Sequence, residues 1–261
     1  MTAAARPSGR PTHFVQSLER GLAVIRAFDA EHTALTLSDV ARATGLTRAA
    51  ARRFLLTLTD LGYVRTDGKQ FALTPRVLDL GYAFLSSLTL PEVAEPHLER
   101  LAAELRESSS VSVLDGDEIV YVARVPTSRI MRASINVGTR FPAYATSMGR
   151  VLLAALPEPE LTAYLDRAVI EPLTARAIDN AEDLEEELAR VREQGWALVD
   201  GELEPGLRSV AAPLHGRGGA VVAALNVSTS ATRDSVEHLV EAYVPALLRT
   251  AAAIDADLRL V

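Results

Sequence analysis

LTLSDVARATGLTRAAARRFLLTLTDLGYVRTDGKQFALT, residues 35–74, decides the fold of the N-terminal part of the chain. Thr36 is followed three residues later by Asp39, a pattern typical of a capping box at the start of a helix. Gly45 is the residue type that most often ends a helix, and Thr47 is a second N-cap soon after it. The segment therefore predicts two helices joined by a tight turn.

A β-hairpin follows this pair of helices. The helix that follows Thr47 ends at Gly62. YVRT and FALT then flank Asp67-Gly68, which is a strong hairpin signal. Before the quoted segment, residues 17–28 have apolar side chains spaced by four, three and three, which predicts one more helix. Helix, helix, helix and hairpin is the order of a winged helix-turn-helix domain, which we assign to residues 14–75.

The helix that follows Thr47 is the third of the domain, and the residues at its start favour DNA binding. In a helix-turn-helix this helix enters the major groove, and its N-terminal residues touch base edges. An arginine fork binds guanine bidentately or clamps phosphate, and the two hairpin cations are placed to meet the flanking DNA backbone. An ordinary solvated basic helix would carry the same arginines, so the turn and the hairpin are what favour DNA. The predicted DNA-binding residues are Thr47, Arg48, Ala49, Arg52, Arg53, Arg65 and Lys69.

The charge is divided unevenly along the chain. Residues 1–76 carry 11 basic and six acidic side chains, a balance of +5, whereas the remainder has a balance of −12 within a net charge of −7. A basic head can approach phosphate, and an acidic body cannot wrap it without repulsion. The asymmetry agrees with DNA binding by the N-terminal part, although uneven solvated surface would look the same.

Composition narrows the class of protein further. The chain has 261 residues, 48% of them hydrophobic, and no cysteine, which excludes disulfides and cysteine-ligated metals. No apolar run reaches the length of a membrane span, and the first 15 residues lack the apolar core of a signal peptide. We expect a cytoplasmic protein with no membrane association. Residues 1–13 are predicted to be a flexible arm, in which Arg6, Arg10 and His13 either belong to a disordered tail or reach the minor groove.

After the hairpin we expect a linker helix at residues 76–90 and an α+β domain at residues 91–261. One broad apolar stripe runs along the linker from Val77 to Leu88, and it either docks on its own domain or packs in a homodimer, which we favour. Further helices are expected at 92–107, from Ser147, at 181–194 and from about 234. Six strands, one of them IMRASINV at 130–137, would form a mixed, mainly antiparallel sheet.

These segments resemble the IclR family of bacterial regulators. FVQSLERGLAVIRAF and the quoted segment are similar to its DNA-binding half, and INVGTRFPAYATSMGRVLLAAL and GWALVDGELEPGLRSVAAPL are similar to two signature stretches of its effector half. The resemblance covers nearly everything after residue 13. AYATSMGRVLLA most resembles the branch that controls aromatic-acid breakdown through the protocatechuate, 4-hydroxybenzoate and β-ketoadipate pathway.

The resemblance implies a GAF-like or profilin-like effector domain, dimers formed through the DNA-binding half and linker, and tetramers formed as dimers of dimers. It also implies a repressor or activator that binds operator DNA and responds to a small organic acid, without a cofactor. Ser209 stands where many relatives have cysteine. The effector-binding residues that it implies are Ala145, Thr146, Ser147, Met148, Gly149, Asp200, Glu202, Ser209, Asn226 and Ser228.

Physical reasoning supports part of this assignment. Ser147 begins a helix, and the N–H groups and dipole at a helix N-terminus favour an anion, although an ordinary serine cap is equally compatible. Because residues 77–261 carry −12, a carboxylate must be stabilised locally. Arg132 is one candidate counter-ion, and a solvated strand arginine is the plainer interpretation of it.

Catalytic motifs are weak. The stretch 145–149 is one substitution from G-x-S-x-G but lacks a preceding buried strand and an obvious histidine base, and the five histidines have no metal-ligand spacing. We therefore expect no enzyme and no metal site. Two alternatives stay open: a ligand-binding or enzymatic domain whose helical head mediates assembly, and an architectural DNA binder that needs no ligand.

Overall fold

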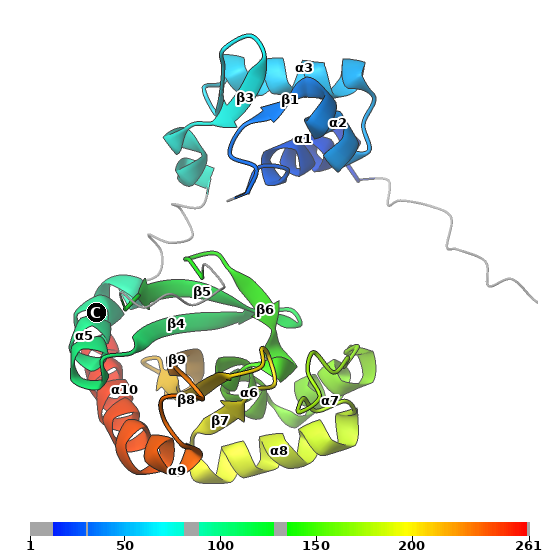
Figure 1. Cartoon of the computed structure of the whole chain (residues 1–261). Coiled ribbons are helices and arrows are strands. Elements are labelled where there is room, and N and C mark those ends of the chain that lie inside the picture. Colours follow the sequence, from blue (N-terminus) through cyan, green and yellow to red (C-terminus); the bar gives the residue numbers. More distant parts are fainter. Residues whose placement is uncertain (1–12, 30, 81–88, 128–134, 260–261) are drawn as a thin grey trace, which may run out of the picture. The chain divides into compact units, whose positions relative to one another are not determined.

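The computed structural model describes residues 13–29, 31–80, 89–127 and 135–259. The chain divides into two compact units, Met1–Phe84 and Leu85–Val261 (Figure 1). The boundary falls inside the predicted linker helix, of which residues 81–88 lie outside the described residues. Residues Pro75–Leu78 before them form a single 3-10 turn, η1. The predicted arm lies outside the described residues except for His13.

The N-terminal unit has the order that the sequence predicts, with one added strand. Its elements are α1 Gln16–Arg26, β1 Leu35–Thr36, α2 Leu37–Thr44, α3 Arg48–Asp60, β2 Val64–Thr66 and β3 Gln70–Leu73. The capping box is present, since Thr36 Oγ1 accepts from the Asp39 N–H, and Gly45 ends α2 at φ 65°. β1 pairs with β3, so the hairpin becomes a three-stranded antiparallel sheet.

Buried side chains from all three helices hold this unit together. Val24, Val40, Ala51 and Leu55 are fully shielded and pack with the hairpin residue Val64. The apolar face of α1 is only partly buried in this unit. Its C-terminal part is buried, whereas Leu18 and Leu22 are 62% and 48% exposed.

The C-terminal unit contains a six-stranded sheet in the order β6-β5-β4-β9-β8-β7, and every pairing is antiparallel. Pairing of β4 with β9 joins the first and last strands of the unit. The strands are β4 Ser108–Asp115, β5 Glu118–Val125, β6 Arg140–Pro142, β7 Ala197–Asp200, β8 Leu207–His215 and β9 Val221–Ser230. The two-domain α+β fold class expected from the sequence is confirmed.

The expected strand at 130–137 does not extend to its predicted end, and its first five residues lie outside the described residues. Residues 135–137, the described part of the IMRASINV segment, are not in a strand, and β6 at Arg140–Pro142 forms the edge of the sheet instead. The apolar alternation that predicted the strand lies next to Gly138, whose φ of 89° turns the chain before it pairs with β5. A helix that the sequence pattern did not predict, α7, covers Glu158–Arg167.

Helices cover both faces of the sheet (Figure 1). On one face, α5 Thr89–Leu105 and α10 Val244–Leu258 share a buried apolar cluster with β8 and β9. On the other face, α6 Ser147–Ala154 and α8 Ala181–Gln194 pack over Ala197, Ala211 and Ala224. Small residues at these positions let α6 lie close to the sheet. Strands β7, β8 and β9 follow α8 in the chain. The short helix α9 Val236–His238 and the π-helical turn η3 Leu239–Tyr243 then lead into α10.

Candidate functional site

The seven predicted DNA-binding residues are all exposed and lie on two adjacent elements of the N-terminal unit. Thr47 caps α3 by accepting a hydrogen bond from the Ala50 N–H at 3.2 Å. Arg48, Arg52 and Arg53 follow on the first two turns of α3. Within the described residues no carboxylate pairs with these three arginines, so their guanidinium groups are available to an external anion.

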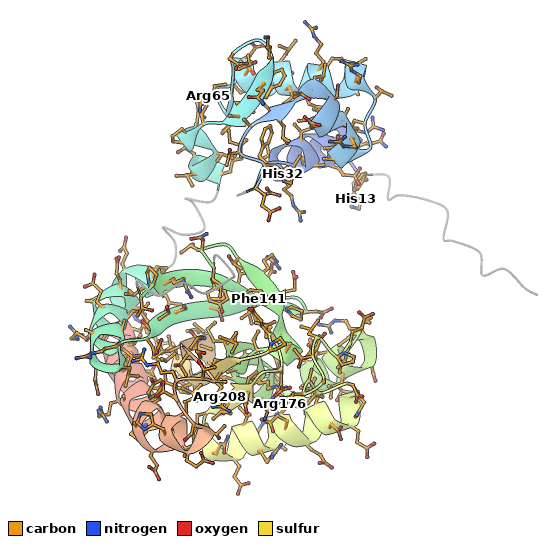
Figure 2. All side chains as sticks on the ribbon, in the orientation of Figure 1. His13, His32, Arg65, Phe141, Arg176 and Arg208 are labelled. Carbon is orange, nitrogen blue, oxygen red and sulfur yellow. The ribbon has the colours of Figure 1, made fainter. Side chains whose placement is uncertain are left out.

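The hairpin carries the other two cations on a rigid turn. Asp67 Oδ1 accepts from the N–H groups of Lys69 and Gln70 at 2.8 and 2.7 Å. These two backbone hydrogen bonds, that of Gln70 first, lower the pKa of Asp67. Arg65, labelled in Figure 2, lies on β2. Lys69 lies in the turn, and both side chains are exposed. The hairpin therefore presents two cations in a fixed arrangement beside α3.

A cavity in the C-terminal unit lies between the N-terminus of α6 and strands β8 and β9. Its lining includes seven of the ten predicted effector-binding residues, namely Ala145, Thr146, Ser147, Met148, Ser209, Asn226 and Ser228. Residues from three separate parts of the chain meet there because Ser209 and Ser228 are direct partners in the β8–β9 register. Ser147 Oγ donates to Ser209 Oγ at 2.9 Å, which joins α6 to the sheet.

Two residues in the first turn of α6, Ser147 and Met148, line this cavity. The Thr146 N–H reaches Ala143 O, and the Gly149 N–H donates to Thr146 Oγ1 at 3.0 Å. The Ser147 and Met148 N–H groups belong to the first turn of the helix and therefore have no acceptor within it. Gly149 has a packing role instead, because a Cβ at that position would lie 2.1 Å from Ala143 O.

The cavity is small, with a volume of about 20 Å³. That is room for roughly one water molecule, whereas sites for small organic ligands usually measure about 300–1,000 Å³. An organic acid could enter only if the lining moves apart. Burial raises the pKa of Tyr121, another lining residue, to about 12, so its phenol is a neutral donor at physiological pH.

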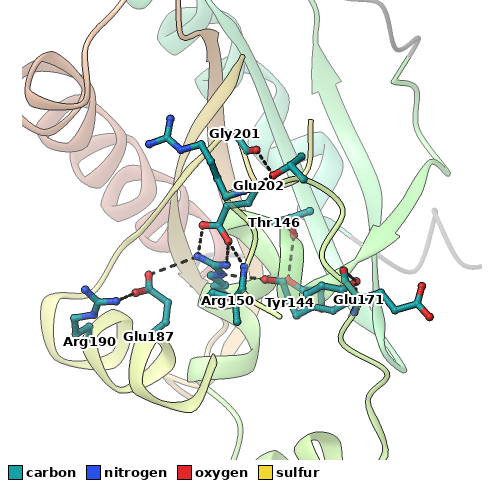
Figure 3. A network of polar contacts seen from close by, with 12 residues as sticks. Tyr144, Thr146, Arg150, Glu171, Glu187, Arg190, Gly201 and Glu202 are labelled. Atoms are coloured by element: carbon teal, nitrogen blue, oxygen red, sulfur yellow. Dashed lines mark hydrogen bonds and ion pairs between the residues drawn. The ribbon is translucent and has the colours of Figure 1, made fainter. Parts of the chain in front are cut away.

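Asp200 and Glu202 do not line the cavity, because each is held in an ion pair. Asp200 is bound by Arg208 and Arg176 at 2.7 Å each, and both arginines are labelled in Figure 2. Glu202 accepts from Arg150 Nη1 and Nη2 at 2.9 and 2.5 Å (Figure 3). Two carboxylates that would repel an anion are neutralised by these contacts.

Arg150 fixes the position of the loops around the cavity. It is 2% exposed, and its Nε donates to Tyr144 O at 3.0 Å, while Glu187 lies 3.8 Å away (Figure 3). Glu202 Oε2 also accepts from the Ile178 N–H at 3.2 Å. One buried guanidinium thus joins α6 and α8 to the segment between β7 and β8.

Sequence reasoning missed five lining residues: Tyr121, Ile135, Val199, Leu203 and Leu207. They are mainly apolar, and their alternation along strands was a signal for burial and not for a binding site. Tyr121 could have been found from its alternation on β5 once the pairing of that strand was known. Arg132, the suggested counter-ion, lies outside the described residues.

Comparison with known proteins assigns the chain to a family. The family described as "IclR helix-turn-helix domain" matches residues 17–68, and "Bacterial transcriptional regulator IclR C-terminal" matches residues 82–256. The chain belongs to the IclR family. It is therefore a transcriptional regulator with a helix-turn-helix domain and not an enzyme, which removes the hydrolase interpretation of residues 145–149.

Individual relatives cover almost the whole chain. The Pca regulon regulatory protein of Pseudomonas putida is 45% identical over 90% of this chain and 81% of its own length. A solved structure from Rhodococcus sp. RHA1 is 60% identical, with a TM-score of 0.86 over 95% of this chain and 99% of that chain. An IclR homolog from Microbacterium hydrocarbonoxydans, complexed with 4-hydroxybenzoate, has 26% identity and a TM-score of 0.84 over 94% of this chain and 100% of that chain.

Two statements about membrane spans and metal sites hold for residues 13–29, 31–80, 89–127 and 135–259. None of their helices is long and apolar enough to cross a membrane. No group of three or more histidine, aspartate or glutamate side chains among them is arranged to hold a metal ion.

Proposed function

We propose that this IclR-family regulator controls genes of aromatic-acid breakdown, in the β-ketoadipate and protocatechuate pathway, by binding a small organic acid in its C-terminal unit. The observation that carries the proposal is the meeting of Ser147, Ser209, Asn226 and Ser228 at one cavity. The P. putida relative is named for the Pca regulon, and the M. hydrocarbonoxydans homolog holds 4-hydroxybenzoate. These relatives supply the chemical class, and the cavity supplies polar partners for it.

Operator DNA is bound, in this proposal, by the seven exposed residues of α3 and the hairpin. Arg48 and Arg52 are four residues apart and share one helix face, so both guanidinium groups can reach base edges in the major groove. Arg65 and Lys69 would contact phosphates on either side and set the register. A regulator of this kind acts in the cytoplasm, where its operator is.

The functional unit is proposed to be a homodimer that pairs into a dimer of dimers. Leu18 and Leu22 lie four residues apart on α1 and are 62% and 48% exposed, and Phe14, two residues before the helix, is 40% exposed. A contiguous apolar stripe of this kind on a soluble unit marks an interaction surface. A two-fold pair of helix-turn-helix units would read an operator with two related half-sites.

Signal transfer follows from the size of the cavity. An acid that enters a space of about 20 Å³ must separate α6 from strands β8 and β9. If the separated arrangement favours a different spacing of the DNA-binding units, binding of acid and operator are coupled by about 1–3 kcal/mol, or 5- to 150-fold. Because coupling is reciprocal, operator DNA would change acid affinity by the same factor.

Calorimetry of the full chain with 4-hydroxybenzoate, protocatechuate and β-ketoadipate tests the proposal, followed by operator titrations with and without each acid. We expect one of these acids to bind and to change operator affinity at least fivefold. Ser228→Phe should abolish binding by filling the cavity, whereas Ser230→Phe, on the exposed end of β9, should not. Failure of all three acids to bind would refute the assigned ligand class, and binding unaffected by Ser228→Phe would refute the assigned cavity.

A further inference from the structure

Three buried polar atoms without a partner lie on one face of the sheet. The described residues contain four such side-chain atoms, and three of them are Ser112 Oγ on β4, Arg124 Nε on β5 and Asn226 Oδ1 on β9. Buried polar atoms are almost always hydrogen-bonded, so each exception requires an explanation. Their position on three neighbouring strands suggests a common one.

The strand register places Arg124 and Asn226, two of these three residues, in one row beside the cavity. Ser110 is paired with Arg124 on one side and with Asn226 on the other, so the three side chains form a row across β5, β4 and β9. Residues directly opposite in an antiparallel pair point to the same face. Asn226 lines the cavity, and so does Tyr121, which a β-bulge places opposite Ser112 and thus on the same face as Arg124. The row is therefore a continuation of the cavity floor.

The row contains a cation that no described carboxylate neutralises. Arg124 Nη1 donates to Ser110 Oγ at 3.1 Å, and its Nε has no acceptor. Burial lowers the pKa of the Arg124 guanidinium, because the charged form loses hydration there. An anion within hydrogen-bond distance would offset this penalty. By contrast, Arg150 and Arg208 on the same unit each have a carboxylate partner.

Asn226 needs a hydrogen-bond donor, whereas Arg124 needs an acceptor. Its Nδ2 donates to Ser228 Oγ at 3.0 Å, which leaves Oδ1 as a buried acceptor with no donor, and the residue is 3% exposed. The nearby phenol of Tyr121 and hydroxyl of Ser112 have no hydrogen bond to it. The cavity and its floor thus offer one unused cationic donor and one unused neutral acceptor on strands separated by β4 alone.

We propose that Arg124 and Asn226 together select a hydroxy-substituted aromatic acid, with the carboxylate on Arg124 and the hydroxyl proton donated to Asn226 Oδ1. This inference rests on the proposed function and narrows its ligand class. An ionised dicarboxylate such as β-ketoadipate satisfies Arg124 but has no donor for Asn226. A hydroxybenzoate carries both groups on a rigid ring.

Calorimetry with matched ligands tests the selection on the unaltered protein. The ligands are 4-hydroxybenzoate, benzoate without the hydroxyl, 4-hydroxybenzamide without the charge, and β-ketoadipate. We expect each of the last three to bind about 10- to 100-fold more weakly than 4-hydroxybenzoate, since each leaves one buried group unpaired. Equal or tighter binding of benzoate or β-ketoadipate would overturn the role of Asn226, and equal binding of the amide would overturn that of Arg124.

Two variants assign the discrimination to residues. Arg124→Gln should bring the acid and the amide within about threefold of each other, and Asn226→Leu should do the same for 4-hydroxybenzoate and benzoate. Arg140→Gln is the control, because Arg140 lies on the edge strand and pairs with exposed Asp115 and Glu118. If Arg124→Gln retains the full acid preference while Ser228→Phe abolishes binding, the cavity stands and this inference fails. If no acid binds the unaltered protein, the proposed function fails and the selection with it.

Discussion

The guanidinium of Arg150 and the carboxylate of Glu202, 52 positions apart in the chain, are joined by two hydrogen bonds of 2.9 and 2.5 Å. Arg150 is 2% exposed, so its charge has lost nearly all contact with water. A buried ion pair adds little net stability, but removal of one partner leaves an uncompensated charge. The pair therefore determines whether α6 and the segment after β7 keep their positions.

We predict that Glu202→Ala lowers the free energy of unfolding by about 3–5 kcal/mol, measured by urea denaturation. Glu118→Gln is the matched control, because Glu118 pairs with Arg140 at 2.7 Å on the exposed edge of the same sheet. That surface pair should contribute less than about 1 kcal/mol. A loss below 1 kcal/mol for Glu202→Ala would contradict the structural role of the pair.

The second prediction concerns operator recognition by α3. Arg48→Ala and Arg52→Ala should each cost about 1–3 kcal/mol on the operator and much less on unrelated DNA, because base contacts carry the sequence preference. Lys69→Ala should weaken both DNAs alike and reduce the salt dependence. Arg26→Ala, an exposed arginine on α1, is the control. Anisotropy titrations at several salt concentrations measure all four, and unchanged operator affinity in the Arg48, Arg52 double variant would sink the assignment.

Local patterns were sufficient to predict the helix-turn-helix, because capping signals and hairpin turns act over three or four residues. Thr36, Asp39 and Gly45 have the roles that their spacing indicates. The IclR resemblance placed seven effector-binding residues that meet at one cavity, among them Ser147 and Ser209. Their contact with an effector stays a prediction.

Long-range pairing could not be predicted from the sequence. Asn226 becomes a neighbour of Ser110, and so lies in one row with Arg124, only because β4, near the start of the unit, pairs with β9 near its end. No periodicity in the chain encodes that strand order. The buried ion pair of Arg150 could not be predicted for the same reason, because its partner Glu202 lies on a loop distant in the sequence.

The third prediction tests the close packing of α6. Gly149→Ala should destabilise the C-terminal unit by at least about 2 kcal/mol, because the added Cβ would lie 2.1 Å from Ala143 O and the backbone there must shift. Gly218→Ala is the control, since no atom lies within 4 Å of its added Cβ. Thermal denaturation measures both, and equal melting temperatures would show that the loop yields without strain.

The fourth prediction concerns oligomeric state. Leu18→Glu combined with Leu22→Glu should convert a dimer to a monomer at micromolar concentration, because two charges would be buried in an apolar interface. Val169→Glu is the control, as Val169 is 75% exposed in the C-terminal unit. Sedimentation velocity is the measurement. A monomeric unaltered protein, or a variant that remains dimeric, would argue against α1 as the interface.

The last prediction is a loss of stability at alkaline pH that depends on Tyr121. Burial raises the pKa of its phenol to about 12, above the value of about 10 expected in the unfolded chain. Below pH 10 both states keep the proton, and the stabilisation is complete. Between pH 10 and 12 only the unfolded state releases it, so the free energy of unfolding falls by up to about 1.4 kcal/mol per pH unit.

Urea denaturation at pH 8, 9.5, 10.5 and 11.5 measures this slope. Tyr121→Phe removes the titrating group and keeps the ring that meets Phe141 edge-on at 6.0 Å. The variant should therefore lose stability less steeply than the unaltered protein above pH 10, while Tyr164 and Tyr243, whose pKa values burial also raises to about 12, keep part of the slope in both. Parallel curves for the two proteins across the whole range would mean that Tyr121 ionises in the folded state as readily as in the unfolded chain, and that its phenol is open to water.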